Sequence, residues 1–397
     1  MIAESSTASE KIPPREPLHV LTLTPFYPIP GDDAQGCFVA EPLSWLARLG
    51  VANTVRAVQP FYRGRAAVDD KAVPARRVSF FSFPGGWGLS SAGAFLFASL
   101  LPEIRRLHEQ HPVHVIHAHS ALPCGHAASL LSRELKIPFV VTVHGLDAFS
   151  SRQVTGYAGK WCVRVSQSVY RTACSVICVS ERVRSQVIEG AGARVNTTVL
   201  YNGVDPEMFA PPESEPEAPV VLSVGNLIPV KGHELLLRAC GAIRDRFPQL
   251  SLEIIGDGPE QAHLQRLAGE QGLTGRVHFR GRQSRREVAE AMRRATIFAL
   301  PSRYEGLGCV YLEAMSAGRP VVACLGQGID EVIEPDMNGC LIDADDLQGL
   351  IDTLARLLQQ AELRRRMGDT ARRTILHGYT LAEQAARLFQ VYRECRK

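Results

Sequence analysis

Two glutamates flank a glycine-bearing loop in the segment PSRYEGLGCVYLEAM. Glu305 follows a predicted strand, Glu313 lies eight residues later, and Gly306 and Gly308 allow a ligand close to the backbone. A helix is predicted to begin near Cys309, and the free N–H groups of a helix start form a site for phosphate or diphosphate. Carboxylates beside such a site can accept hydrogen bonds from sugar or ribose hydroxyls. The spacing alone fits an ordinary surface glutamate and a helix carboxylate equally well.

The segment GNLIPVKGHELLLRA carries a second candidate. Gly225 and Asn226 follow a predicted strand, and Lys231 precedes a helix expected to begin near His233. A lysine in this place can meet phosphate charge as a mobile point cation. A solvated lysine at a helix start is just as common.

Four histidines, His111, His114, His117 and His119, lie close together in the sequence. Such a cluster raises the question of a metal site. On a strand His117 and His119 share one face while His114 points the other way, which argues against three converging ligands. His144 stands at the carboxyl end of the next predicted strand, shortly before Asp147. It fits either a site residue or a hydrogen-bonded packing residue.

These residues must be positioned by strands that alternate with helices. Predicted strands cover 19–24, 113–119, 138–145 and 175–180 in the first half, and 220–225, 252–256, 277–281, 296–302 and 320–324 in the second. Most are apolar throughout, as parallel sheets buried on both faces require. The fold class is therefore α/β with doubly wound parallel sheets, in which ligands bind beyond the carboxyl ends of strands.

The chain is too long for one hydrophobic core, since single cores stop growing at roughly 250–300 residues. The segment 206–219 holds five prolines and four glutamates and is predicted to be a linker outside the core. It separates a domain at 17–205 from one at 220–379. Residues 1–16 are expected to form a disordered tail.

Composition excludes several classes of protein. No apolar run is long enough to span a bilayer, and the N-terminus has no apolar core of a secretory signal, so we expect a cytoplasmic protein. Net charge is only +3, which argues against nucleic acid as a partner. The ten cysteines form no Cys-x-x-Cys pair and are expected to be buried free thiols. The sequence contains no phosphate-loop, nucleophile-elbow or HExxH motif. It also lacks the dinucleotide fingerprint GxGxxG, which argues against an NAD-dependent dehydrogenase.

The ordered set of motifs resembles the retaining glycosyltransferases of family four, the group 1 transferases, whose two Rossmann-like domains form the arrangement called GT-B. The resemblance runs from about Leu18 to the C-terminus through TPFYPIPGDDAQGCFV, HAHSALPCG, HGLD, YNGVDPEMF, VGNLIPVKG, GDGPE, PSRYEGLGCVYLEAMSAGRPVV and NGCLID. It implies two domains facing a central cleft, with acceptor binding in the first and nucleotide-sugar binding in the second. The last helix, at about 380–397, would cross back onto the first domain.

The resemblance also implies residue roles. Glu305 would contact the transferred sugar, His144 would face it from the first domain, and Lys231 would bind phosphate; these three form the catalytic set. Glu313 would hold the ribose. Further donor-binding positions are Gly36, Gly225, Asn226, Gly306, Leu307, Gly308, Cys309 and Val310. Acceptor-binding residues stay open, with His119 and Asp147 as candidates, and no metal or other cofactor is implied.

One position departs from the family pattern, because Asn226 stands where an arginine is usual. An asparagine cannot clamp phosphate with two charged hydrogen bonds. Arg282 or Arg303 could substitute.

The implied reaction moves a sugar from a nucleotide diphosphate to an acceptor hydroxyl with retention of configuration and without a protein nucleophile. Two alternatives stay open: a non-catalytic sugar-nucleotide scaffold, which Asn226 favours, and a nucleotide-sugar epimerase of the same architecture. Residues 1–205 carry a net charge of +5, which suggests a lipid-linked or glycan acceptor of cell-surface polysaccharide synthesis at the inner membrane face. The apolar stretch Trp87–Leu101, followed by Arg105 and Arg106, either lies in the membrane interface or forms a buried helix.

Overall fold

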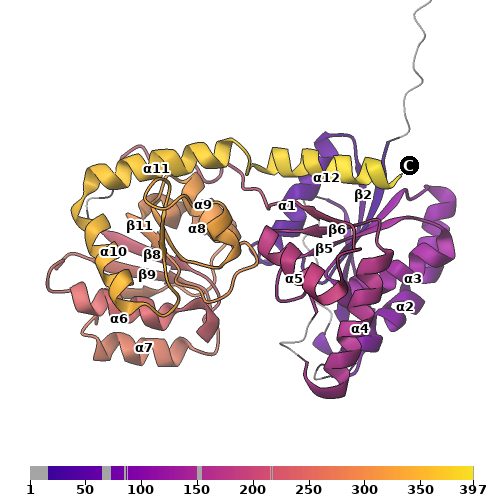
Figure 1. Ribbon diagram of the computed structural model, residues 1–397, viewed down its shortest axis with the longest axis horizontal. Helices are drawn as coiled ribbons and strands as arrows, with labels where there is room; N and C mark the ends of the chain where they lie inside the picture. The colour runs from indigo at the N-terminus through magenta and orange to yellow at the C-terminus, as the bar shows by residue number, and fades with distance from the viewer. Residues whose placement is uncertain are drawn as a thin grey trace, which may run out of the picture.

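The computed structural model describes residues 17–64, 73–84, 86, 88–149, 154–214, 216 and 218–396. The predicted tail at 1–16 and Trp87 lie outside these residues. Figure 1 shows two domains side by side, joined along one side by the last two helices.

The first domain is built on a seven-stranded sheet in the order β3-β2-β1-β4-β5-β6-β7, with parallel pairing throughout. Its strands are β1 (His19–Thr24), β2 (Ala52–Pro60), β3 (Ala75–Phe80), β4 (Val115–His119), β5 (Phe139–Val143), β6 (Ser175–Cys178) and β7 (Thr197–Val199). Its helices are α1 (Cys37–Arg48), α2 (Leu89–Gln110), α3 (His126–Leu135), α4 (Gly156–Thr172) and α5 (Glu181–Ala191).

The second domain repeats this plan with a six-stranded parallel sheet in the order β10-β9-β8-β11-β12-β13. Its strands are β8 (Val220–Val224), β9 (Ser251–Ile255), β10 (Val277–Phe279), β11 (Ile297–Ala299), β12 (Val321–Cys324) and β13 (Cys340–Ile342). Its helices are α6 (His233–Ile243), α7 (Gln261–Glu270), α8 (Arg285–Arg294), α9 (Cys309–Ser316), α10 (Leu347–Gln359) and α11 (Ala361–Leu376), and α12 (Leu381–Cys395) follows. The predicted class of two doubly wound parallel sheets is confirmed.

The strands that the sequence did not predict lie mostly at the sheet edges. β3 contains Arg76 and Arg77, and β7 is only three residues long with every side chain partly exposed. An edge strand lacks a neighbour on one side and needs no continuous apolar run, so its pattern is weaker than that of a central strand.

Both sheets reverse their strand order at a defined point, which determines where ligands can bind. β1 and β4 are neighbours in the first sheet, and β8 and β11 are neighbours in the second. The loops that leave such a pair run to opposite sides and leave a crevice between them. In the second sheet these two loops are the ones that carry Lys231 and Glu305.

The predicted linker is partly a core element, contrary to our expectation. Phe209 is fully buried, and its carbonyl accepts hydrogen bonds from Ser316 Oγ (3.0 Å) and Arg372 Nη1 (3.2 Å). Prolines and glutamates dominate the composition of the segment, so composition alone did not indicate that its one phenylalanine is buried.

Helix α12 crosses back onto the first domain, as the resemblance implied. In Figure 1 the yellow α11 and α12 run from one domain to the other. Ala385, Leu388 and Tyr392 join the hydrophobic cluster that α1 forms with the first sheet. Cys174 and Cys395 form a disulfide across 221 residues of sequence, so the expectation that all ten cysteines are free is wrong. The local sequence around each cysteine contains no signal for a partner so distant.

Helix α2 contains most of the apolar stretch that was considered for the membrane interface. Ala92, Leu96, Leu100 and Ile104 are buried in the core, which favours the buried-helix alternative. Among the described residues, no helix combines the length and the apolar character needed to cross a bilayer.

Candidate active site

Lys231 and Glu305 meet at the crevice of the second sheet. The ammonium Nζ of Lys231 donates to Glu305 Oε1 over 2.6 Å, and both side chains are largely buried. Lys231 ends a short 3-10 turn, Pro229–Lys231, after β8, and Glu305 lies in the loop after β11. A Cβ at Gly225 would lie 3.7 Å from Lys231 Cδ, so the lysine stem passes beside this glycine. Two groups 74 residues apart are thus joined because their strands are neighbours.

The Glu305 loop is held in place from both domains. The Glu305 N–H donates to Gln327 Oε1 (3.0 Å), and Ser180 Oγ of the first domain donates to the Gly306 carbonyl (2.6 Å). A Cβ on Gly306 would lie 1.9 Å from the carbonyl oxygen of His144. Only glycine fits there, and the loops with Glu305 and His144 are therefore in direct contact.

Helix α9 points its N-terminus toward this crevice. It begins at Cys309 after Gly308, whose φ of 86° provides the left-handed turn into the helix. Leu307 is buried, whereas Gly308, Cys309 and Val310 are partly exposed. Because the first N–H groups of a helix have no partner within it, the start of α9 can bind an anion next to Lys231.

Glu313, in the second turn of α9, is only 3% exposed. Its Oε1 accepts from Arg285 Nη1 at 2.5 Å. Its Oε2 is buried and has no hydrogen-bond partner among the described residues. A buried carboxylate oxygen without a donor is costly to leave unpaired, so Glu313 Oε2 is an unsatisfied hydrogen-bond acceptor.

Arg285 joins Glu313 to the first domain. It is 7% exposed, and its Nε and Nη2 donate to the two carboxylate oxygens of Glu41 over 2.8 and 3.2 Å. The guanidinium also lies 4.8 Å over the Phe209 ring. Burial raises the pKa of the Glu41 carboxyl, and the charge of Arg285 opposes that shift. Sequence analysis did not single out Arg285 or Glu41.

The start of helix α8 places Arg285. Ser284 and Glu287 form a capping box, in which the Glu287 carboxylate accepts from the Ser284 N–H at 2.8 Å. Arg285 is therefore the first residue of the helix, and its own N–H donates to Asp33 Oδ1 over 2.8 Å. The box itself is visible as S-x-x-E in the sequence, but the partners of Arg285 lie far away in the chain.

Three histidines are packed together on β4 and directly after β5. His119 Nδ1 and His144 Nε2 are 3.1 Å apart with stacked rings, and His117 contacts Tyr392 and Thr142. Burial lowers the pKa of His144 to about 3 and that of His117 to about 3. These imidazoles are therefore neutral at physiological pH, and one nitrogen of the His119–His144 contact donates while the other accepts.

Asp147 lines a cavity of about 420 Å³ beyond the strand ends of the first sheet. Its Oδ1 accepts from the His144 N–H at 2.9 Å, while Oδ2 is buried without a partner among the described residues. Burial raises the pKa of Asp147 to about 6. The cavity walls include Phe26, Leu122 and Val154, so the carboxylate stands in apolar surroundings.

Gly36 and Asn226, two further predicted donor-binding positions, differ in their surroundings. Gly36 precedes α1, and a Cβ there would lie 2.5 Å from the Phe26 carbonyl carbon, so this glycine is required for packing of the chain on itself. Asn226 is exposed. The possible substitutes for the missing arginine are already engaged: Arg282 pairs with Asp257 and Asp32, and Arg303 pairs with Asp345.

Sequence analysis also missed residues that hold the two domains together. The carboxylate of Glu331 accepts from the N–H groups of Glu181 and Arg182, each over 2.8 Å, and from Tyr201 OH over 2.9 Å. Glu331 thus caps helix α5 of the other domain. No group of three or more histidine, cysteine or acidic side chains able to hold a metal occurs among the described residues; a metal-free reaction stays a prediction.

Family models match both halves of the chain. Residues 38–208 match the description "Glycosyltransferase Family 4", and residues 204–374 match "Glycosyl transferases group 1". The chain belongs to this family. An uncharacterised glycosyltransferase of Methanocaldococcus jannaschii is 30% identical over 264 residues, covering 66% of this chain and 71% of its own length.

Two further proteins, one with a named activity and one with a solved structure, are similar to this group 1 glycosyltransferase. A GDP-mannose-dependent alpha-(1-6)-phosphatidylinositol monomannoside mannosyltransferase of Mycolicibacterium smegmatis is 28% identical over 319 residues, covering 74% of this chain and 81% of its own. The crystal structure of HepE from Anabaena in complex with UDP-glucose has a TM-score of 0.73 at 21% identity, covering 94% and 99% of the two chains. This structural likeness supports the GT-B fold alone.

Proposed function

We propose that this group 1 glycosyltransferase transfers a sugar from a nucleotide-diphosphate sugar to an acceptor hydroxyl, with retention at the anomeric carbon. The observation that carries the proposal is the Lys231–Glu305 pair beside the start of α9. It combines a cation, a carboxylate and a helix N-terminus in one crevice. A diphosphate and its sugar need these three groups together.

The donor diphosphate is expected to lie between Lys231 and the N-terminus of α9. Negative charge grows on this group as the bond from the anomeric carbon to the phosphate oxygen breaks. Fixed cationic and N–H donors stabilise that charge, and loss of one such donor typically raises the barrier by about 3–4 kcal/mol. In this proposal no metal is required for that task.

The acceptor hydroxyl attacks the anomeric carbon from the face that the diphosphate leaves. The new carbon–oxygen bond forms there, and the hydroxyl proton passes to the departing phosphate oxygen, so no protein nucleophile is needed. Glu305 holds the transferred sugar. His144, neutral because of its burial, faces the sugar from the first domain.

The acceptor is proposed to enter the cavity of about 420 Å³ that Asp147 lines. The free Oδ2 of Asp147 supplies a hydrogen-bond acceptor for a sugar hydroxyl, and the apolar walls can pack against a sugar ring or lipid. His119 is bonded to His144 and supports that ring. The mannosyltransferase relative acts on a phosphatidylinositol monomannoside, which is consistent with a lipid-linked glycan acceptor here.

Arg285 is proposed as a positioning residue for the donor. It fixes one oxygen of Glu313 and leaves the other free for the ribose hydroxyls. Because the same guanidinium holds Glu41 of the first domain, this arrangement also ties the donor site to the contact between domains.

Thermal stabilisation by UDP, GDP, ADP and dTDP tests donor binding first. A ligand at about 100 times its dissociation constant adds roughly 2.7 kcal/mol to the stability of the native state. One nucleotide should raise the melting temperature by several degrees, and the same shift should be absent in Lys231→Ala. If no nucleotide stabilises the protein, the proposal fails.

Turnover separates a transferase from a scaffold. The nucleotide sugar of the selected base, incubated with a lipid-linked glycan acceptor, should give a glycosylated product with retained anomeric configuration. Nucleotide binding without any transfer would favour the scaffold alternative, which the uncharged Asn226 suggests.

A further inference from the structure

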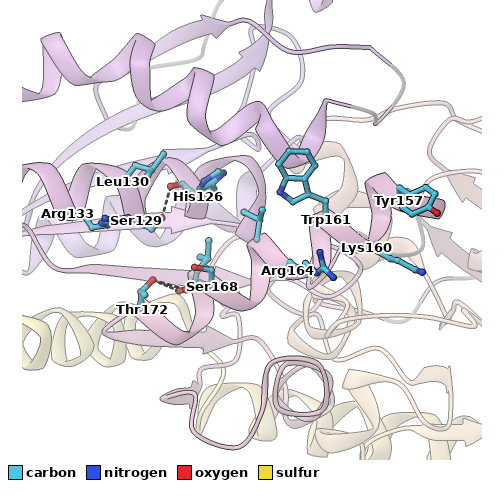
Figure 2. A pocket seen from close by; sticks show the side chains of 12 residues that line it. His126, Ser129, Leu130, Arg133, Tyr157, Lys160, Trp161, Arg164, Ser168 and Thr172 are labelled. Carbon is cyan, nitrogen blue, oxygen red and sulfur yellow. Dashed lines mark hydrogen bonds between the residues drawn. The ribbon is translucent and has the colours of Figure 1, made fainter.

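A groove of about 650 Å³ lies on the first domain, and its lining residues are separate from those of the donor site. It is formed by helices α3 and α4, and Figure 2 shows the side chains that line it. Neither helix contributes a residue to the donor site. The groove therefore has no assigned role in the proposed transfer.

The groove carries positive charge that the protein does not neutralise. Arg133 of α3 and Lys160 and Arg164 of α4 line it, and none of its lining residues is acidic. Within the described part of the chain these three cations form no ion pair. Glu134, which follows Arg133, is bound to Arg105 over 2.5 Å. Lys160 Nζ lies 5.8 Å from the centre of the Tyr157 ring. Three cations without a carboxylate partner beside one groove favour an anionic ligand.

Two aromatic side chains project from the same helix. Tyr157 is 91% exposed and Trp161 is 59% exposed. Both line the groove together with Lys160 and Arg164 of the same helix (Figure 2). Tryptophan and tyrosine together with basic residues are typical of protein surfaces at the level of lipid head groups, where one end of the ring is apolar and the other wet.

We propose that this groove docks on a bilayer that contains anionic phospholipids. The lipid phosphates would sit against Arg133, Lys160 and Arg164, and Tyr157 and Trp161 would enter the head-group layer. Charge complementarity and exposed aromatic rings on a single helix face are the observations that support a membrane over a soluble partner.

The groove adjoins the cavity proposed for the acceptor. Leu122, Val154 and Cys162 form a small buried cluster with Leu89 and Val165. Leu89, Leu122 and Val154 line the cavity of Asp147, whereas Val165 lines the groove. The two hollows therefore share one wall, and a protein docked by the groove would hold the cavity near the lipid surface. This placement rests on the proposed function, while docking itself does not.

A cluster of exposed aromatic rings borders the cavity through one of its members. Phe61, Phe81, Phe83 and Phe95 are exposed and contact one another with ring centroids 5.0–6.5 Å apart. Phe83 is itself part of the cavity lining. These rings form an exposed apolar patch beside the cavity.

Co-sedimentation with vesicles tests the proposal. The full-length protein should sediment with vesicles of phosphatidylcholine mixed with phosphatidylglycerol, but not with phosphatidylcholine alone, and high salt should weaken the binding. Lys160→Glu combined with Arg164→Glu should reduce the partition coefficient at least about tenfold, since each basic residue near an anionic surface contributes several-fold. Trp161→Ser should also reduce the partition coefficient, although it leaves the net charge unchanged.

The matched control is Arg246→Glu combined with Arg266→Glu, which makes the same change of charge on exposed residues of the second domain. It should bind vesicles like the unaltered protein. Equal loss in this control, or unchanged binding of the groove variants, would overturn the proposal. Nucleotide-induced stabilisation is measured on every variant and should stay unchanged. If nucleotides stabilise none of the proteins, including the unaltered one, the proposed function is refuted, but the conclusion from the vesicle experiment is unaffected.

Discussion

Replacing Arg285 with methionine tests how the donor site is supported. The change removes the cation that lies between Glu41 and Glu313 and keeps most of the side-chain volume over Phe209. The side chains of Glu313 and Glu41 are 4% and 22% exposed, so the two carboxylates left without Arg285 would be poorly hydrated. Breaking a buried ion pair by removing one partner costs about 3–5 kcal/mol, and we expect a loss of stability of that size.

Donor binding should weaken as well, for a separate reason. Without Arg285 the Glu313 carboxylate is no longer fixed, and its free oxygen is no longer directed at the ribose. A hydrogen bond to a charged group contributes about 1.5–3 kcal/mol, so the KM for the nucleotide sugar should rise about 10- to 150-fold. Chemical denaturation measures the first effect, and donor titration with excess acceptor measures the second.

A second substitution separates the two effects. Glu41→Gln in the Arg285→Met background removes one stranded charge and should restore part of the stability, but not the donor affinity. Arg286→Met is the matched control, because this neighbouring side chain is 88% exposed and should affect neither quantity. A wild-type KM in Arg285→Met, or recovery of KM by Glu41→Gln, would refute the role given to Arg285.

Three further predictions concern the two crevices. Lys231→Ala should lower kcat about 10²- to 10³-fold through lost stabilisation of the diphosphate; near-normal turnover with saturating donor would exclude that role. Gly306→Ala should lower kcat at least about tenfold while keeping nucleotide-induced stabilisation, since its Cβ would lie 1.9 Å from the His144 carbonyl oxygen and separate the domains; unchanged turnover would contradict this. Because the pKa of Asp147 is raised to about 6 in the folded protein, its stabilising contribution is complete below about pH 4 and is lost as pH rises through 6. The stability of the wild type relative to Asp147→Asn should therefore fall by up to about 3 kcal/mol between pH 4 and pH 7, and parallel pH profiles in denaturation experiments would disprove it.

The sequence by itself determined the features that depend on neighbouring residues. Apolar runs predicted the inner strands except β2. The residues directly after them, such as Lys231, His144 and Glu305, were recognised because parallel strands present their carboxyl ends to ligands. Gly308 and the run after it predicted the start of α9. The motif order predicted the return of α12 to the first domain. Each of these signals lies within a few residues or in the order of segments.

Only the tertiary structure decided which distant groups meet. Arg285 is one of several arginines in a polar stretch, and nothing near it indicates a buried pairing with Glu41 and Glu313, 244 and 28 residues away. The same holds for the burial of Phe209 and for the disulfide between Cys174 and Cys395. Periodicity and capping report only on the local backbone, whereas the cost of a buried charge depends on what the fold brings beside it. The support of the donor site is therefore a property of the packed domains.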